Sequence, residues 1–183
     1  MTASSKRTYP WTDTVDGRPV TFRLMTSEDR DRMLGFAQSL TESDLIFLRV
    51  DITKPEVVDE WVHHIKTGRT ITVLAEDEDG LAGYASLHHN ENAWTRHLGQ
   101  LRILVKGERR KAGLGRKLAN EVFHIAKELK LERIFVQMAA DQPHVRQLFE
   151  EMSFNPEALL TDWLMARDGR THDLLVMSHF VDG

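Results

Sequence analysis

The chain has 183 residues, of which 41% are hydrophobic and 28% charged; its net charge is −4 and it has no cysteine. This composition predicts one globular domain of ordinary size and excludes disulfides, zinc–thiolate sites and a cysteine nucleophile. No apolar run approaches the roughly 20 residues that a membrane helix needs, and the first residues lack the apolar stretch of a signal peptide. We therefore expect a cytoplasmic protein without a membrane partner.

The first half of the chain predicts two helices and three strands. Residues 1–17 are polar and are expected to form an N-terminal arm, leaving residues 18–183 as a single domain. In chain order, the expected elements are a strand over residues 20–25, a helix capped by Ser27, a loop over residues 41–44, a helix that begins at Pro55 and ends before Gly68, and strands over residues 70–75 and 81–88. Asp79-Gly80 between the last two strands is a hairpin signal.

The second half begins with the candidate central strand, residues 96–105. The clearest helix follows, because apolar residues recur at spacings of three and four from Leu114 to Leu129. Further expected elements are a strand over residues 133–138, a helix from Pro143, and two closing strands over residues 159–167 and 172–180. Hairpins combined with this mixed order predict an α+β fold around one largely antiparallel sheet.

Charge is distributed unevenly along the chain. Residues 1–95 carry a net charge of −6 and residues 96–183 one of +2. Within residues 102–117, seven basic side chains accompany a single acid, Glu108. Such a basic segment in a mildly acidic protein indicates a compact anion site and argues against a nucleic-acid partner. A solvated basic loop is the alternative interpretation.

The basic segment contains a glycine turn, Arg110-Lys111-Ala112-Gly113-Leu114-Gly115, between the central strand and the long helix. Glycines lack side chains and let a ligand approach the backbone closely. The turn also opens a helix, whose free N–H groups and dipole favour an anion. These features together predict a pyrophosphate site. A dinucleotide fingerprint would need a third glycine where the chain has Leu118, and there is no P-loop motif.

The pattern Arg110-x-x-Gly113-x-Gly115, the order of elements and the later segment 148–154 together resemble the GNAT superfamily of acyl-CoA N-acyltransferases. The resemblance covers roughly residues 20–181. It implies a mostly antiparallel mixed sheet of six to seven strands, flanked by about four helices. It also implies that the strands over residues 96–105 and 133–138 splay apart, with a β-bulge in the first of them.

The same resemblance implies acetyl-CoA, or another acyl-CoA, as the cofactor. Its pantetheine arm would pair with the strand edge near Ile103, Leu104 and Val105. The residues that the resemblance places around the pyrophosphate are Arg110, Lys111, Ala112, Gly113, Leu114, Gly115 and Arg116. Further along, Gln142 stands where the family often has asparagine, and Phe149 where it often has a tyrosine that protonates the leaving thiolate. Phenylalanine has no proton to give.

The expected reaction is direct attack of a primary amine on the thioester, which is helped by a general base with a pKa near neutrality. Many relatives have a glutamate on the central strand, where this chain has Gln100, which cannot take a proton. His97 is the nearest residue that can, so we predict catalytic roles for His97 and Gln100. The alternatives for the base are His88, His89, Asp141 and His144, or a proton path through water.

The acceptor is expected to be a small amine, a peptide N-terminus or a protein lysine. Acids in the first half, such as Glu42, Asp59 and Glu60, could draw in a cationic amine, although solvation alone explains them equally well. No metal site is expected, because the nine histidines lack ligand spacing. A regulatory acyl-CoA sensor with little turnover is the alternative function, and a homodimer is possible through the two closing strands.

Overall fold

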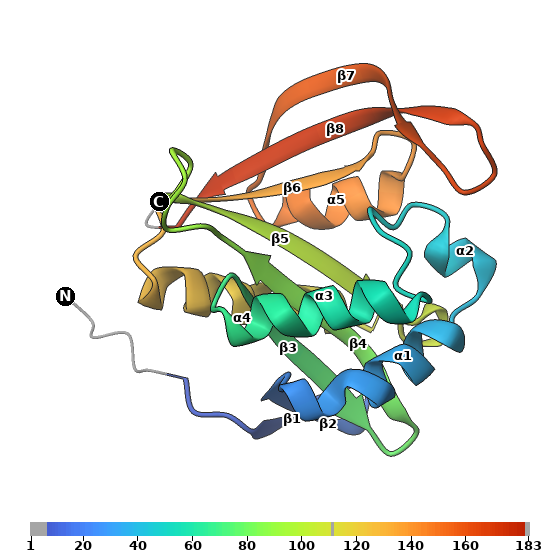
Figure 1. Cartoon of the computed structure of the whole chain (residues 1–183), viewed down its shortest axis with the longest axis vertical. Helices are drawn as coiled ribbons and strands as arrows, with labels where there is room; N and C mark the ends of the chain where they lie inside the picture. The colour runs from blue at the N-terminus through green and yellow to red at the C-terminus, as the bar shows by residue number, and fades with distance from the viewer. Residues whose placement is uncertain (1–6, 111, 182–183) are drawn as a thin grey trace.

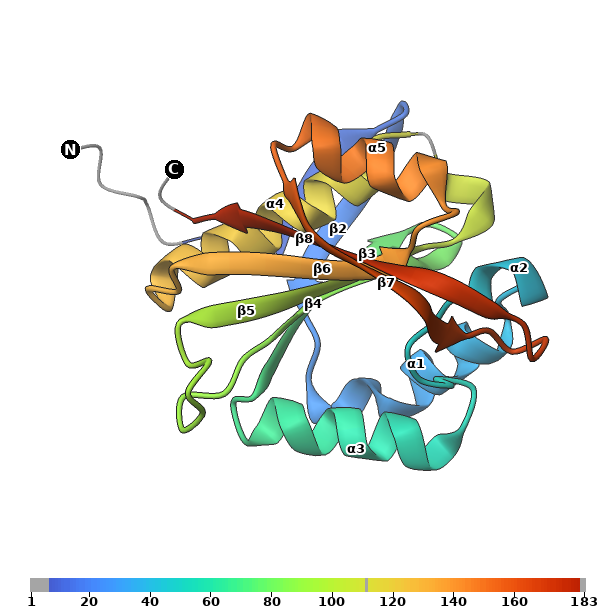
Figure 2. The same cartoon turned by 90° about the horizontal axis from the view of Figure 1, so that it is seen from above.

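A computed structural model describes residues 7–110 and 112–181 of the chain. A single eight-stranded sheet forms the centre, in the order β1-β2-β3-β4-β5-β6-β8-β7 (Figure 1). Seen from above, helices α1 and α3 cover one face of this sheet, and α4 and α5 cover the other (Figure 2). The expected α+β class is confirmed.

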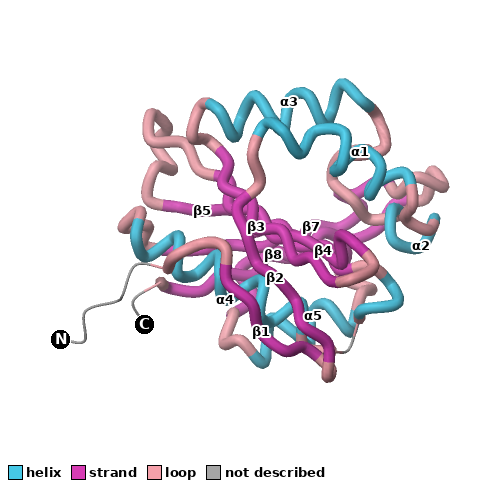
Figure 3. Tube along the Cα trace, turned by 90° about the horizontal axis from the view of Figure 1, so that it is seen from below, coloured by secondary structure: helices cyan, strands magenta, loops and turns pink. Residues whose placement is uncertain are grey.

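The N-terminal part supplies half of the sheet and three helices. Its elements are β1 (Trp11–Val15), β2 (Arg18–Leu24), the 3-10 turn Ser27–Asp29, α1 (Arg30–Gln38), α2 (Glu42–Leu45), α3 (Pro55–Lys66), β3 (Thr70–Asp77) and β4 (Gly80–His88). Figure 3 shows how β1 and β2 continue the sheet away from the longer strands.

Three details differ from the sequence prediction. The expected arm, residues 1–17, contains β1, which pairs antiparallel with β2 from Trp11 to Val15. The cap of the first helical turn is Thr26, not Ser27, since Thr26 and Asp29 form a capping box. Residues 42–45 form the short helix α2, where a loop was predicted, and a second capping box between Thr41 and Asp44 stabilises its start.

The C-terminal part carries the cofactor-binding pattern. Its elements are β5 (Leu98–Val105), the 3-10 turn Gly107–Arg109, α4 (Leu114–Glu128), β6 (Arg133–Ala139), α5 (Pro143–Glu151), β7 (Asn155–Met165) and β8 (Thr171–Phe180). These bounds agree with the predicted strands and helices apart from the ends, except that β7 begins four residues earlier than expected.

Strands β5 and β6 form the parallel pair of the sheet, and their pairing is short. It joins Leu98–Gln100 to Arg133–Phe135 and then stops, although both strands continue. Figure 1 shows the two strands diverging from their paired ends. We call this divergence the fork. The bulge expected in β5 is not observed: its register with β4 is unbroken from Gly83–Val105 to His88–Gln100.

Two apolar clusters lie on the two faces of the sheet. One packs the stripe of α4, including Leu114, Leu118 and Val122, against the sheet; the other packs α1 and α3 around Met33 and Trp61. Within the sheet, the neighbouring strands β4 and β5 are close at Gly83, where an added Cβ would lie 2.6 Å from the carbonyl oxygen of Leu104. Glycine is therefore required for β4 and β5 to approach at this point.

The N-terminal segment is joined to α4 by a buried acid. Glu121, 1% exposed, accepts hydrogen bonds from Arg7 at 2.7 Å, Tyr9 at 2.7 Å and the indole of Trp11 at 3.2 Å. Burial and the neighbouring Glu121 carboxylate raise the pKa of Tyr9 above its usual value. A buried carboxylate with three donors is well satisfied, so this contact fixes β1 against the domain.

Candidate functional site

The fork opens into a cavity of about 1310 Å³. Its walls come from β4, β5, β6, α3, α5 and the segment around α2, and it extends to the glycine turn. Residues from both faces of β5 line it, among them Gln100 and Ile103. The cavity thus joins the two faces of the sheet where β5 and β6 no longer pair.

Beyond the fork, β5 has backbone groups without a strand partner on one side. Lys106 N–H donates to the carbonyl of Ala82 on β4 at 2.9 Å. Because backbone groups alternate along an antiparallel strand, those of Leu104 face β4, whereas those of Ile103 and Val105 face the gap toward β6. Of the three predicted edge residues, Ile103 and Val105 thus have backbone groups directed at the gap, and the side chain of Leu104 is buried in the core.

The glycine turn places Gly113 and Gly115 at the start of α4. Gly113 is the N-cap of α4 with φ +79°, in the left-handed region, and no atom lies within 4 Å of the position of a Cβ. Gly115 has ordinary φ, and its Cβ position lies 3.5 Å from Leu148. Leu114 is 2% exposed, so only its backbone can serve a ligand. Lys111 lies outside the described residues, and Ala112 is partly buried against the core.

The basic residues around this turn do not form the compact cluster that their spacing predicted. Arg110 pairs with Asp44, Arg116 with Glu151, and Lys117 with Asp13. Arg109 also binds two carboxylates, those of Asp77 at 2.8 Å and Asp79 at 2.6 Å. Arg110 and Arg116 still line the cavity. Most of the local positive charge is therefore already neutralised by acids from elsewhere in the chain.

Gln142 and Phe149 lie at the two ends of α5. Gln142 is the N-cap residue of this helix, and both residues are on the cavity wall. Phe149 is 2% exposed and packs edge-to-face on Phe154, with ring centroids 5.0 Å apart. It therefore fills the core beside the cavity and offers no exchangeable proton.

Gln100 is at the centre of a polar network at the fork. Its Nε2 donates to Gln137 Oε1 of β6 at 3.0 Å, and its Oε1 accepts from Arg102 Nη2 at 3.0 Å. Arg49, from the segment after α2, donates to the same Gln137 oxygen. The network connects both strands of the fork with an arginine from the opposite wall.

Some of the candidate bases lie on the cavity wall, and others lie outside it. His97 is exposed in the loop before β5 and is not part of the cavity wall, because it lies beyond the paired end of the fork. His89 is also outside the wall. His88, Asp141 and His144 line the cavity. His88 lies opposite Gln100 in the β4–β5 register, and its Nδ1 lies 2.9 Å from Thr70 Oγ1.

Burial changes the charge behaviour of several groups in this cavity. It lowers the pKa of His88 to about 3, assisted by the positive charges of Arg102, His64, Arg49 and His89. His88 is thus neutral at physiological pH. Burial also raises the pKa of Tyr84, so its phenol keeps its proton. Burial and the charge of Arg49 lower the pKa of Arg102 to about 10.

Sequence reasoning missed four polar residues of the site: Arg49, Tyr84, Arg102 and Gln137. Alternation along β5 puts Arg102 on the same face as Gln100, so that signal was available. The contact of Arg49 with Gln137 joins residues 88 positions apart. No local pattern could have indicated it.

Within residues 7–110 and 112–181, no helix combines the length and apolar character needed to cross a membrane. Over the same residues, no group of three or more histidines and acids is arranged to hold a metal ion.

Comparison with known proteins identifies a family model. The model of the acetyltransferase (GNAT) family matches residues 37–154, which include the fork and the glycine turn. No curated protein matches the chain significantly.

Many solved structures share the fold. A ribosomal-protein-alanine N-acetyltransferase from Brucella melitensis has a TM-score of 0.74 at 23% identity, over 87% of this chain and 98% of that one. A spermidine N-acetyltransferase from Vibrio cholerae, solved with CoA and spermine, has a TM-score of 0.74 at 20% identity, over 89% and 96%. A Salmonella typhimurium protein solved with its cofactor acetyl-CoA has a TM-score of 0.75 at 18% identity, over 90% and 95%.

Proposed function

The chain belongs to the acetyltransferase (GNAT) family, and on this premise we propose that it transfers the acetyl group of acetyl-CoA to a primary amine by direct attack. The observation that carries the proposal is the fork, where β5 and β6 stop pairing after Gln100 and Phe135 and a cavity opens beside the glycine turn. Bound acetyl-CoA supplies an activated thioester carbonyl. The chain has to bind that molecule, orient the amine and handle the protons.

The glycine turn fits a pyrophosphate. The first N–H groups of α4 have no partner within the helix, and the Cβ position of Gly113 is open. We assign the pyrophosphate to the backbone of residues 111–116, with the side chains of Arg110 and Arg116 at the cavity wall. Gln142 and Phe149 would border the same ligand from α5.

The edge of β5 fits an extended amide-bearing arm. The backbone groups of Ile103 and Val105 face the gap, and one of them, the carbonyl of Val105, accepts from Arg110 Nε at 3.1 Å. Pairing of the pantetheine arm with this edge would satisfy the remaining groups as an added strand does. The role expected of Leu104 is then limited to packing beneath the arm.

Gln100 and His88 are the groups that we assign to the incoming amine. Gln100 lies at the fork and can orient the amine by hydrogen bonding. His88, its neighbour across β4 and β5, is neutral at physiological pH, and with a pKa of about 3 it can take the proton only when the bound substrates raise that pKa toward neutrality. His97 is not retained as the base, because a base must come within hydrogen-bond reach of the amine and His97 lies off the cavity.

The thiolate that departs needs a proton that Phe149 cannot give. Tyr84 is a phenol on the cavity wall, and burial keeps it protonated. We therefore assign this donation to Tyr84, acting directly or through one water.

The acidic first half gives little support to a polycationic acceptor. Asp59 pairs with Arg30, and Glu76 with Arg23 and Arg32. Neither acid lines the cavity. The names of the structural neighbours refer to acceptors as different as a ribosomal-protein alanine and spermidine. The acceptor must therefore be argued from the cavity itself.

Two measurements test the proposal. Calorimetry should detect acetyl-CoA binding, and a panel of amines should release free CoA thiol. Binding without release for any amine would favour the regulatory sensor. Absence of both would overturn the proposal.

The choice of base has its own test, which is the pH dependence of kcat/KM. His88→Gln is expected to lower kcat/KM by about 100-fold and to alter its pH profile. His97→Ala should leave both unchanged. The reverse result would return the role to His97.

A further inference from the structure

We propose that the acceptor amine also carries a carboxylate, and that Arg102 and Arg49 bind this carboxylate inside the cavity. The acceptor class is an amino acid or another short amino-carboxylate. The inference rests on the proposed function, because it names the acceptor of that same site.

Arg102 has donors available for a ligand. It lies on β5 opposite Ser86 and lines the cavity. Its Nη2 donates to Gln100 Oε1 at 3.0 Å, whereas its Nε is buried and has no hydrogen-bond partner. A guanidinium carries five N–H donors in one plane, a geometry that matches a carboxylate. A buried N–H without a partner is costly, and a shift of the Arg102 side chain toward a bound carboxylate would relieve that cost.

The positive charges of Arg102 and Arg49 are not matched by nearby carboxylates on the cavity wall. Arg110 and Arg116 also line the cavity, but each pairs with a carboxylate, Asp44 and Glu151 respectively. Within the described part of the chain, neither Arg102 nor Arg49 forms an ion pair. Arg49 is exposed, so solvent screens much of its charge, whereas Arg102 is half-buried; a bound anion would offset the cost of the unpaired Arg102 charge.

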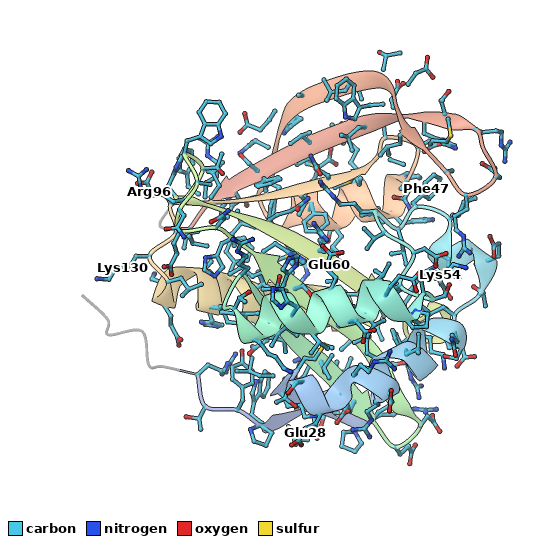
Figure 4. All side chains as sticks on the ribbon, viewed as in Figure 1. Glu28, Phe47, Lys54, Glu60, Arg96 and Lys130 are labelled. Carbon is cyan, nitrogen blue, oxygen red and sulfur yellow. The ribbon has the colours of Figure 1, made fainter. Side chains whose placement is uncertain are left out.

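The remaining acids of the wall do not fill this role. Asp141 is bound to His172 at 2.8 Å. Glu60, on α3 (Figure 4), has a 70% exposed side chain whose ion-pair partner is His64 at 4.0 Å. Solvent screens a charge that exposed. His88 is neutral and adds no negative charge.

The position of the arginines sets the size of the acceptor. Arg102 is two residues from Gln100 on the same face of β5, and its guanidinium reaches back to Gln100, with Nη2 3.0 Å from Oε1, so groups bound at the two side chains lie only a few ångströms apart. Gln100 bonds directly to Gln137 at the fork, where the acetyl group is to be presented. An amine at the fork and a carboxylate at Arg102 therefore belong to a molecule about as long as an amino acid.

The binding of such an anion would also help the proposed base. Burial is the largest cause of the low pKa of His88, and Arg102 and Arg49 are two of the charges that lower it further. A carboxylate paired with both would reduce their effect, so the acceptor would bring the imidazole closer to the basicity that proton transfer requires.

The test compares each common L-amino acid with its own amide, together with spermidine, as acceptors in the thiol-release assay. The best amino acid should exceed its amide in kcat/KM by about 10- to 100-fold, the value of a charge-assisted hydrogen-bond pair. Arg102→Met should remove this preference, lowering kcat/KM for the amino acid by much more than for its amide.

Arg96→Met is the matched control. Arg96 is exposed in the loop before β5 (Figure 4), does not line the cavity and, among the described residues, has no ion pair. This variant should behave like the parent chain. The thermal midpoint of Arg102→Met should be unchanged or raised, because the substitution removes an unpaired cation from a mostly buried position.

Several results would overturn the inference. One is that the parent chain uses amides or spermidine as well as, or better than, amino acids. Another is that Arg102→Met lowers kcat/KM equally for the amino acid and its amide. A third is the absence of turnover with any amino-carboxylate. Turnover with amides or spermidine alone would leave the proposed function intact. Failure to bind acetyl-CoA, with no turnover of any amine, would remove the proposed function as well.

Discussion

Gln100 Nε2 donates a 3.0 Å hydrogen bond to Gln137 Oε1 at the fork, joining the last paired residue of β5 to a residue of β6 beyond the pairing. Arg49 donates to the same oxygen. One amide oxygen thus links both strands and the opposite wall. Side-chain hydrogen bonds therefore fix the distance between β5 and β6 at the point where their backbone hydrogen bonds end.

Replacement of Gln137 by leucine should therefore impair catalysis more than cofactor binding. The change leaves Gln100 and Arg49 without their shared acceptor, and kcat/KM should fall by about 10- to 100-fold through misplacement of the acceptor groups. The Kd of acetyl-CoA, measured by calorimetry, should stay within about threefold. Gln38→Leu, at the exposed end of α1, is the control. A Gln137→Leu enzyme with parental kcat/KM would contradict the role of the network.

Gly113 and Gly169 allow a matched test of the glycine turn. Their φ angles are +79° and +81°, and a Cβ at either would meet no atom within 4 Å. Alanine at each position should cost about 1–2 kcal/mol of unfolding free energy through left-handed strain. Only Gly113→Ala should weaken acetyl-CoA binding, by about tenfold or more, because only this residue starts α4. Equal affinities for the two variants would exclude the turn as the cofactor site.

Gly83 is expected to be the least replaceable glycine of the sheet. A Cβ there would lie 2.6 Å from the Leu104 carbonyl oxygen and 3.1 Å from Val105 Cα, both backbone atoms that cannot rotate away. Gly83→Ala should therefore cost about 2–3 kcal/mol in chemical denaturation. Gly35→Ala, in the middle of α1 with open space around it, should gain about 0.5–1 kcal/mol. The changes in unfolding free energy of the two variants should therefore have opposite signs, and a shared sign would contradict this account.

His88 should make folding stability depend on pH in the acid range. Its pKa is about 3 in the folded protein, below the 6.5 of an unperturbed histidine. Below pH 6.5 the unfolded chain binds a proton that the folded chain refuses, so stability falls as the pH falls toward 3 and is constant above 6.5.

The size of this effect follows from linkage. Between pH 7.5 and pH 5.0, His88 should account for about 1–2 kcal/mol of lost unfolding free energy. The comparison of the parent chain with His88→Gln by urea denaturation at both pH values isolates this contribution. The groups whose charges act on His88 are Arg102, His64, Arg49 and His89. An identical pH dependence in the two proteins would show that His88 is not buried in its neutral form.

Local sequence signals predicted most of the elements because each depends on nearby residues. The stripe from Leu114 to Leu129 can only bury its apolar side as a helix, and Asp79-Gly80 supports only a tight turn. The strand β1 was missed because a polar edge strand lacks the apolar alternation of an inner one. Helix α2 was missed because its four residues are stabilised by capping and not by an apolar stripe.

The sequence by itself determined the family, the glycine turn and the positions of the strands that form the fork, since these are encoded by short-range spacing and backbone preference. Only the tertiary structure decided how charges pair. In the folded chain, Asp44, Glu151 and Asp13 pair with the basic segment. His97 lies outside the cavity, and Arg102 lies near Arg49 without a carboxylate partner among the described residues. Electrostatic partners act through space at a few ångströms, and the distances between residues far apart in the chain are set by packing alone.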